Sequence, residues 1–310
     1  MKPRHLLLIA PVFIGIAILS GLLTTTSSED QLRALSVDGV DRTYALHVPV
    51  SYDKSKPTPL VVALHGRLAT GEGEERLAHF HSVSDRHDFL VVYPNGLQRS
   101  WADGRGSTPA DRKSIDDVKF LSALIDKLSS TYNIDSSRIY AAGMSNGGFM
   151  AGRLACELPD RIAAVAIVGA SLSTDVAEGC HPAKPVSVTI VQGTEDPLVP
   201  FGGGALRRDG SGGTILSHKD AVEKWVALDR CSAPATKDAI ADSAGDGTTI
   251  NVETFASCAD GSEVRSYVVV HGGHTWPGGQ QYLPASLIGT TTRNLDGSAV
   301  IWDFFSHHSR

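Results

Sequence analysis

The chain has 310 residues, of which 42% are hydrophobic and 20% are charged, and its formal net charge is −6 at pH 7. That hydrophobic content can build a core, which excludes a wholly disordered chain. The lack of a Gly-X-Y or heptad repeat excludes collagen-like and long coiled-coil folds. The acidic balance and the lack of a Lys/Arg cluster argue against a nucleic-acid partner. A length near 300 suits one large α/β domain or two small ones.

Residues 1–28 have the order of an export segment. Lys2 and Arg4 precede an apolar stretch at residues 6–23, and a polar Thr/Ser segment follows. Basic, apolar and polar segments in that order are typical of a signal peptide. The apolar part is long for a signal peptide and short for a spanning helix, so cleavage and retention as a membrane anchor both stay open. We expect a secreted, periplasmic or extracellular protein, which touches a membrane only through this segment if it is retained.

Strand-like and helix-like segments alternate along the rest of the chain. Residues 44–48 alternate in polarity and predict an early antiparallel strand. Continuous apolar runs predict buried strands at 60–64, 89–93, 139–142, 162–168, 186–191 and 264–270. Helices are predicted at 115–132, where apolar residues recur every three or four, and at 147–156, 217–228 and 298–305. Strands separated by helix-length segments indicate one α/β domain over residues 31–310, with a mostly parallel sheet and helices on both faces.

The four cysteines all lie in the part of the chain that would be exported, and no C-x-x-C motif is present. An even number of cysteines in an oxidising compartment favours two disulfides over a zinc or redox site. Three pairings are possible. Cys156–Cys180 and Cys231–Cys258 are favoured, because each closes a loop of about 25 residues in local order.

Residues 143–147 form a G-x-S-x-G pentapeptide with Ser145 at its centre. It follows a short apolar strand and precedes a helix-compatible segment, which is the context of a nucleophile elbow. In such an elbow the turn is sharp, so its flanking positions must be small, and the serine is held out at the end of the strand. The alternative interpretation is a Gly-rich turn with an ordinary serine.

A serine is a poor nucleophile at neutral pH and needs a base that is oriented by an acid. Glu195 and Asp196 follow one apolar strand, and His271 and His274 follow a later one. Asp196 is favoured because prolines fix the loop after it, and His274 because it lies beyond the strand in a Gly-rich loop. Ser145, Asp196 and His274 then stand in the chain order Ser, Asp, His that this fold uses.

An oxyanion hole needs two backbone N–H donors that point at the developing negative charge. The residue after the nucleophile, Asn146, is expected to supply one. The second is expected from the loop after an early strand, with Arg67 as the candidate and Leu68 as the alternative. His65 is interpreted as a structural histidine near the site.

Taken together, these segments resemble the secreted α/β-hydrolase esterases that include polyhydroxybutyrate depolymerases and feruloyl esterases. The resemblance covers residues 41–305 and implies an α/β-hydrolase fold with Ser145 as nucleophile, Asp196 as orienting acid and His274 as base. It implies no metal and no organic cofactor. The chain departs from many relatives at residues 67–70, which are poorer in Gly and carry no Cys. The matching segments are 59–66 (PLVVALHG), 93–96 (YPNG), 101–105 (WADGR), 116–120 (DDVKF), 143–148 (GMSNGG), 193–196 (GTED) and 272–279 (GGHTWPGG).

The resulting hypothesis is an exported serine esterase that forms an acyl-enzyme on Ser145. Trp276 and Trp101 are candidate substrate-binding residues, with plain packing as the alternative for Trp276. The substrate is expected to be a polyester oligomer or a plant cell-wall ester. The alternatives are an acetylxylan-type carbohydrate esterase, a peptidase with the same triad, and a catalytically silent surface-binding protein on the same fold.

Overall fold

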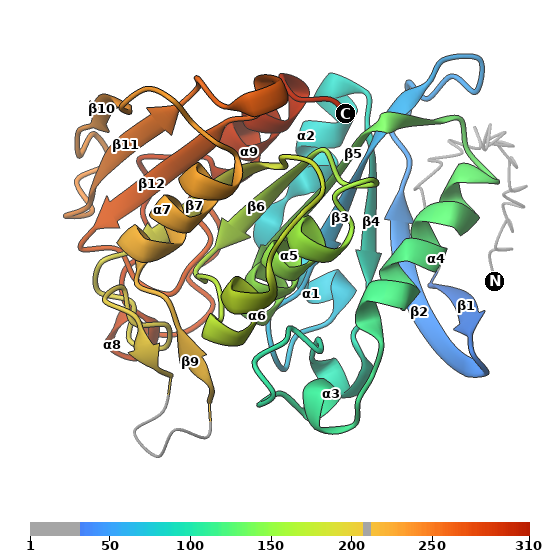
Figure 1. The fold of residues 1–310 in the computed structure, drawn as a ribbon, viewed down its shortest axis with the longest axis horizontal. Coiled ribbons are helices and arrows are strands. Elements are labelled where there is room, and N and C mark those ends of the chain that lie inside the picture. Colours follow the sequence, from blue (N-terminus) through green and yellow to red (C-terminus); the bar gives the residue numbers. More distant parts are fainter. Residues whose placement is uncertain (1–31, 207–211) are drawn as a thin grey trace, which may run out of the picture.

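The computed structural model describes residues 32–206 and 212–310, so the predicted export segment at residues 1–28 lies outside the described residues. Ten strands form one sheet in the order β1-β2-β4-β3-β5-β6-β7-β12-β11-β10 (Figure 1). These strands are β1 (Arg33–Val37), β2 (Val40–His47), β3 (Thr58–Leu64), β4 (Leu90–Pro94), β5 (Ile134–Met144), β6 (Ala164–Val168), β7 (Ser187–Gly193), β10 (Thr236–Ile240), β11 (Thr249–Phe255) and β12 (Val264–Val270).

The six strands in the middle of the sheet, from β4 to β12, are parallel. At one edge β2 runs antiparallel to both β1 and β4, which confirms the predicted early antiparallel strand. At the other edge β11 and β10 add an antiparallel hairpin that the sequence did not predict. The mostly parallel α/β sheet expected from the sequence is therefore confirmed.

The helices cover both faces of the sheet. Helices α4, α5, α6 and α7 contribute buried side chains to one apolar cluster, and α1, α2 and α9 contribute to the other. The bounds of the helices are α1 (Gly71–Ala78), α2 (Phe80–His87), η1 (Leu97–Arg99), α3 (Pro109–Arg112), α4 (Asp117–Ser129), α5 (Asn146–Glu157), α6 (Thr174–Gly179), α7 (His218–Leu228), η2 (Ala259–Gly261), α8 (Ala285–Ile288) and α9 (Gly297–Ser306), and a small separate ribbon joins β8 (Gly204–Ala205) to β9 (Thr214–Ile215).

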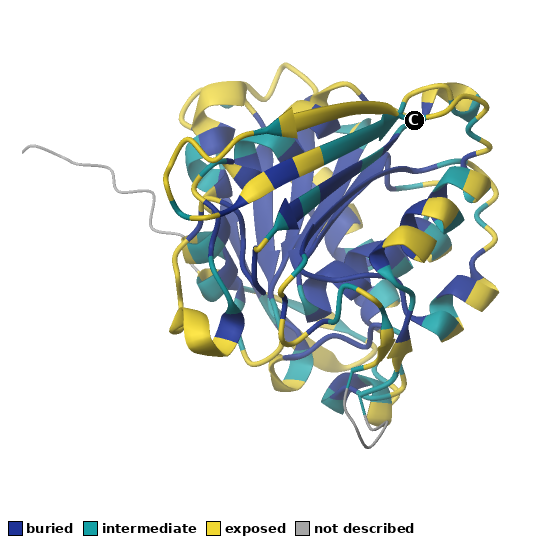
Figure 2. Cartoon of the chain, turned by 90° about the vertical axis from the view of Figure 1, so that its left-hand side faces the viewer, coloured by how far each residue is buried: buried dark blue, intermediate teal, exposed yellow. Residues whose placement is uncertain are grey.

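Strand β3 shows why the central strands read as unbroken apolar runs. Leu60, Val62 and Leu64 point into the first cluster, while Val61 and Ala63 point into the second. Because successive side chains of a strand point to opposite faces, a sheet covered on both faces needs apolar residues at every position. Figure 2 shows the central strands buried and the outermost strand at the near edge exposed.

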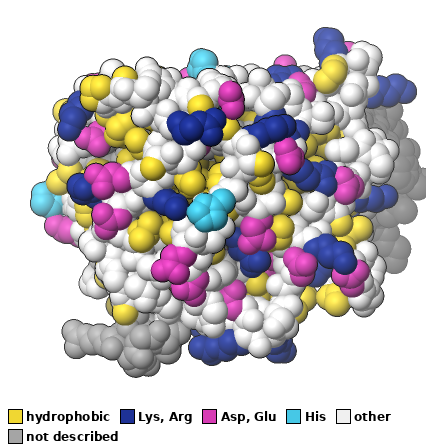
Figure 3. Space-filling view, in the orientation of Figure 1, with side chains coloured by type: hydrophobic (Ala, Val, Ile, Leu, Met, Phe, Trp, Pro, Cys, Tyr) yellow, Lys and Arg dark blue, Asp and Glu magenta, His cyan; other side chains and the backbone are white. Residues whose placement is uncertain are grey.

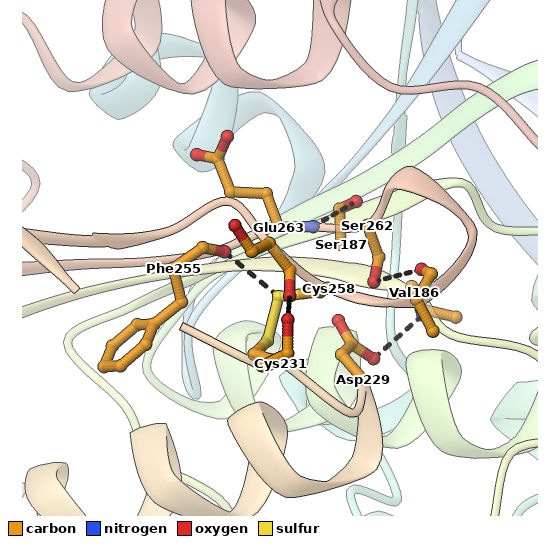
Figure 4. The surroundings of a disulfide bond; sticks show 11 residues. Val186, Ser187, Asp229, Cys231, Phe255, Cys258, Ser262 and Glu263 are labelled. Carbon is orange, nitrogen blue, oxygen red and sulfur yellow. Dashed lines mark hydrogen bonds between the residues drawn. A yellow bond between two sulfur atoms is a disulfide. The ribbon is translucent and has the colours of Figure 1, made fainter. Parts of the chain in front are cut away.

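Both predicted disulfides are present. Cys156–Cys180 joins α5 to the end of α6, and Cys231–Cys258 joins the end of α7 to the turn before η2. Figure 4 shows Asp229 beside the second disulfide, where one carboxyl oxygen accepts the Val186 N–H at 3.3 Å. Burial raises the pKa of this carboxyl to about 7.

Candidate active site

Ser145 lies at the turn between β5 and α5. Its backbone has φ 56° and ψ −118°, a left-handed conformation that is strained for a residue with a side chain. Its N–H donates to the carbonyl oxygen of Val168 at 2.8 Å, which ties the turn to the neighbouring strand β6. The turn lies at the carboxyl ends of the parallel strands, the edge where α/β proteins place their sites.

The glycines on either side of Ser145 are required by close backbone packing. A Cβ atom at Gly147 would lie 2.0 Å from the carbonyl oxygen of Leu64, at the end of β3. A Cβ atom at Gly143 would lie 2.4 Å from the carbonyl carbon of Gly147. The G-x-S-x-G pattern therefore reflects how tightly α5 starts against β5 and β3.

His274 and Asp196 come together in the loops that follow β12 and β7. The His274 Nδ1 lies 2.7 Å from the Asp196 Oδ2, and both residues are buried. The other carboxyl oxygen accepts the N–H groups of Leu198 and Val199, each at 2.8 Å. The carboxylate is thus held in place, and the Nε2 atom of His274 is the ring nitrogen available for proton transfer.

The loop that carries His274 is fixed through its backbone. The His274 N–H donates to the carbonyl oxygen of Ile288 at 2.6 Å, and the Tyr282 hydroxyl donates to the carbonyl oxygen of His274 at 2.8 Å. A Cβ atom at Gly273 would lie 2.1 Å from the same Ile288 oxygen. The glycine before the histidine is therefore needed for the loop to pack this closely.

Glu195 and His271, the alternatives to Asp196 and His274, form a separate pair. The His271 Nδ1 lies 2.7 Å from the Glu195 Oε1, and both side chains are more than half exposed. Neither residue lines the cleft that contains Ser145. Asp196 and His274 therefore stay the candidates for the orienting acid and the base.

Asn146 is the first residue of α5, so its N–H has no acceptor within the helix. Its side chain is held by hydrogen bonds to Trp101 and Asp103. The Oδ1 atom accepts the Trp101 N–H at 2.7 Å, and the Nδ2 atom donates to the Trp101 carbonyl oxygen at 3.1 Å and to the Asp103 Oδ2 at 2.5 Å. These bonds fix the start of the helix next to Ser145.

The loop after β3 lies against the nucleophile, since a Cβ atom at Gly66 would be 3.6 Å from the Cβ of Ser145. Within this loop the Leu68 N–H donates to the carbonyl oxygen of Arg99 at 2.8 Å. In the described parts of the chain, no backbone acceptor is found for the Arg67 N–H. Leu68 is therefore unsuitable as the second oxyanion donor, and Arg67 stays the candidate.

His65 supports this loop from the interior. Its Nε2 accepts the Gly96 N–H at 2.9 Å, its Nδ1 donates to the Gly66 carbonyl oxygen at 2.8 Å, and its own carbonyl oxygen accepts the Trp101 Nε1–H at 2.9 Å. Burial lowers the pKa of His65 to about 4, so the ring is neutral at pH 7. Such a ring can accept from Gly96 only because it is uncharged, which fits the structural role inferred from the sequence.

Ser145, Asn146, Arg67 and His274 all line one cleft of about 950 Å³. Trp101 and Trp276 are buried and do not line it. Trp276 donates to the Ser298 hydroxyl and packs on Phe80 instead. We therefore expect both tryptophans to support the site from behind rather than touch substrate. The other side chains that line the cleft include Leu68, Ala69, Glu74, Arg76, Leu77, Arg105, Arg112, Met144, Leu198, Leu206, Tyr282 and Leu283.

Residues 32–206 and 212–310 contain no cluster of three or more His, Cys, Asp or Glu side chains that could hold a metal ion. In the same ranges no helix is both long and apolar enough to cross a membrane.

On the face viewed in Figure 3, basic and acidic side chains are interspersed.

Comparison with known proteins gives concordant matches. A family model described as "Esterase PHB depolymerase" matches residues 42–193. The protein named "Putative esterase NocK" of Nocardia uniformis subsp. tsuyamanensis is 33% identical over 291 residues, which cover 91% of this chain and 82% of that protein. Feruloyl esterase B of Piromyces equi is 27% identical over 233 residues, which cover 73% of this chain and 41% of that longer protein.

Solved structures match the fold over most of the chain. The acetyl xylan esterase from Aspergillus awamori has a TM-score of 0.59 at 14% identity, covering 89% of this chain and 99% of that one. A thermostable esterase has a TM-score of 0.58 at 18% identity, covering 90% of this chain and 63% of that one. At these identities the likeness shows the fold alone.

Proposed function

The chain belongs to the esterase family of PHB depolymerases and is a carboxylic-ester hydrolase, and we propose that it works through a Ser145–His274–Asp196 triad and an acyl-enzyme. The observation that carries this proposal is the buried 2.7 Å contact between His274 and Asp196, in the loops beside a strained Ser145. Ser145 and His274 line the same cleft.

In the first half of the reaction, the Ser145 Oγ attacks the ester carbonyl carbon and the His274 Nε2 takes its proton. The N–H groups of Asn146 and Arg67 stabilise the oxyanion, and the Asp196 carboxylate stabilises the imidazolium ring. The tetrahedral intermediate then collapses. The alcohol leaves with the proton from His274, and the acyl group stays on Ser145.

In the second half, His274 accepts a proton from water, and the resulting hydroxide attacks the acyl carbonyl. The second intermediate releases the acid as His274 returns the proton to Ser145. Each proton taken by His274 is given back within the same half-reaction. The residues described therefore complete the cycle with ester and water as the only reactants.

The proposed substrates are esters of the polyhydroxybutyrate or feruloyl type, since a feruloyl esterase is among the relatives. Acetylated xylan is the alternative, because a bifunctional acetylxylan esterase/xylanase of Neocallimastix patriciarum is 28% identical over half of this chain. The two disulfides support export to an oxidising compartment.

The test compares the wild type with Ser145→Ala on methyl ferulate, hydroxybutyrate oligomers, acetylated xylo-oligosaccharide and a short nitrophenyl ester. We expect Ser145→Ala to lose at least about 10³-fold in kcat while its circular dichroism and Tm stay near those of the wild type. Near-normal hydrolysis by this variant would contradict the proposed mechanism. An inactive wild type that fails to react with a fluorophosphonate would indicate the silent binding protein.

A further inference from the structure

The first turn of α1 carries two acidic side chains in opposite environments. Glu72 is exposed and lies 3.7 Å from the Arg76 Nη1. Glu74 is only 1% exposed and forms part of the wall of the cleft that holds Ser145. An acidic residue in the first turn of a helix usually faces solvent and interacts with the helix dipole, so the inward position of Glu74 needs another explanation.

The carboxyl group of Glu74 has no partner within the described parts of the chain. Both oxygens are buried, and neither makes a hydrogen bond. Burial raises the pKa of this group to about 8, so it is neutral at pH 7. A neutral carboxyl offers one O–H donor and one carbonyl acceptor. Leaving both unpaired costs free energy, which a ligand in the cleft could recover.

Glu74 lines the same cleft as Tyr282, a residue that contacts the loop of His274. The Tyr282 hydroxyl donates to the carbonyl oxygen of His274. The pKa of Tyr282 is raised by burial first and then by Asp196 and Glu74, because both carboxyl groups are ionised in the alkaline range where a tyrosine titrates. Tyr282 is thus within electrostatic reach of both carboxyl groups, and Ser145, Glu74 and Tyr282 all line the same cleft.

None of the arginines that line the cleft is a hydrogen-bond or ion-pair partner of the Glu74 carboxyl group. Arg105 is paired with the buried Asp103 at 2.5 Å, and Arg76 is the partner of Glu72. Arg67 and Arg112 are exposed, and no ion pair joins either of them to Glu74. The carboxyl group of Glu74 therefore has no arginine partner, although the residue lines the cleft.

We propose that Glu74 is a specificity-determining residue whose carboxyl group binds a hydroxyl group of the ester substrate. This inference rests on the proposed function of the same site. A hydroxyl both donates and accepts, which matches a neutral carboxyl. A substrate without the hydroxyl would leave buried polar atoms unpaired, and sites of this kind discriminate strongly. The hydroxyl could belong to the acyl group or to the alcohol.

Two matched substrate pairs distinguish these sources. Methyl 4-hydroxycinnamate against methyl cinnamate reports a hydroxyl on the acyl side. The 2-hydroxyethyl ester of cinnamic acid against its propyl ester reports a hydroxyl on the alcohol side. For each pair the measurement is the ratio of the two kcat/KM values. We expect one of the two ratios to favour the hydroxylated ester by at least about tenfold in the wild type.

The variants separate recognition from folding. Glu74→Met has similar length and no polar group, and we expect it to bring that ratio close to one. Glu74→Gln keeps a donor and an acceptor, and we expect it to retain the preference. Glu72→Gln, in the same turn but exposed, is the matched control and should behave as the wild type. The Tm of each variant checks that it folds.

The outcomes distinguish this inference from the proposed function. Hydrolysis of the nitrophenyl ester by the wild type but not by Ser145→Ala supports the proposed function by itself. If that holds and neither ratio favours the hydroxylated ester, Glu74 does not recognise a substrate hydroxyl and the inference is overturned. A preference that survives in a folded Glu74→Met protein overturns it as well. An inactive wild type overturns the proposed function instead.

Discussion

Two carboxylate–histidine pairs connect the loops after β7 and β12, and they differ in burial. Asp196 and His274 are 7% and 3% exposed, whereas Glu195 and His271 stand in solvent. An exposed ion pair of this kind contributes little to stability. A buried carboxylate that accepts two backbone N–H groups can hold a histidine in one tautomer and orientation.

Asp196→Asn should lower kcat by about 10³- to 10⁴-fold with a small change in KM, because the amide no longer holds the required tautomer of His274 or stabilises its charged form. Glu195→Gln is the matched control, and its kcat should stay within about twofold of the wild type. Steady-state kinetics on a nitrophenyl ester measures both variants. Equal losses from the two substitutions would contradict the assignment of the orienting acid.

We expect the titration of Glu74 to make the free energy of unfolding depend on pH. Its pKa is about 8 in the folded protein against an ordinary value of 4.5. Between these values the folded state keeps a proton that the unfolded chain has lost. The effect of this titration on the free energy of unfolding is therefore absent below pH 4.5. As the pH rises from 4.5 towards 8, the free energy of unfolding decreases.

Glu74→Gln removes this titration. We expect the Tm of the variant relative to the wild type to increase between pH 5 and pH 8, corresponding to a free-energy difference on the order of a few kcal/mol. Thermal unfolding at several pH values measures it. Glu72→Gln should show no such trend, and parallel curves for the wild type and Glu74→Gln would refute the burial of an unpaired carboxyl.

At the scale of elements, the nucleophile depends on how closely α5 approaches β3. A Cβ atom at Gly147 has no space beside the Leu64 carbonyl, and backbone atoms cannot move aside as a flexible side chain can. Strain at Ser145 is maintained only because the surrounding strands and helix fix the turn.

Gly147→Ala should therefore destabilise the protein by about 3 kcal/mol and also lower kcat, because the turn must shift. Gly179→Ala, at the end of α6, is the control, since no atom lies within 4 Å of the added Cβ. Its effect on the free energy of unfolding should stay within about 1 kcal/mol. Urea unfolding and kinetics of both variants check this, and a fully active Gly147→Ala would argue against the tight elbow.

At the scale of the whole molecule, the disulfides link segments that lie on the sheet face opposite α1 and α9. Cys156 and Cys180 are 24 residues apart and connect the helix after the nucleophile to α6. Replacing both by Ala should lower the free energy of unfolding by about 3 kcal/mol, mainly because the unfolded chain gains freedom. Urea unfolding measures the loss. Activity at 25 °C should persist, and a strong loss of kcat without unfolding would show that this link positions Ser145.

Local patterns of the chain are enough to predict the central sheet, the helices α4, α5, α7 and α9, both disulfide pairs and the chain order of the candidates Ser145, Asp196 and His274, whereas α1 and α2 were not predicted. These features depend on short-range periodicity, on turn residues and on chain order. The edge hairpin of β10 and β11 was not predicted, because its largely exposed, polar strands lack a buried apolar run.

Other features depend on residues that are far apart in the chain. The Leu68 N–H is unavailable because Arg99 accepts it, and Trp276 is buried because Phe80 and Ser298 contact it. The inward position of Glu74 likewise was not predicted, since the sequence analysis predicted no helix at residues 71–78. The sequence by itself determined the fold class and the order of the candidate catalytic residues. The tertiary structure decided which donors are free and which side chains line the cleft, because burial and hydrogen-bond pairing arise only when distant segments pack together.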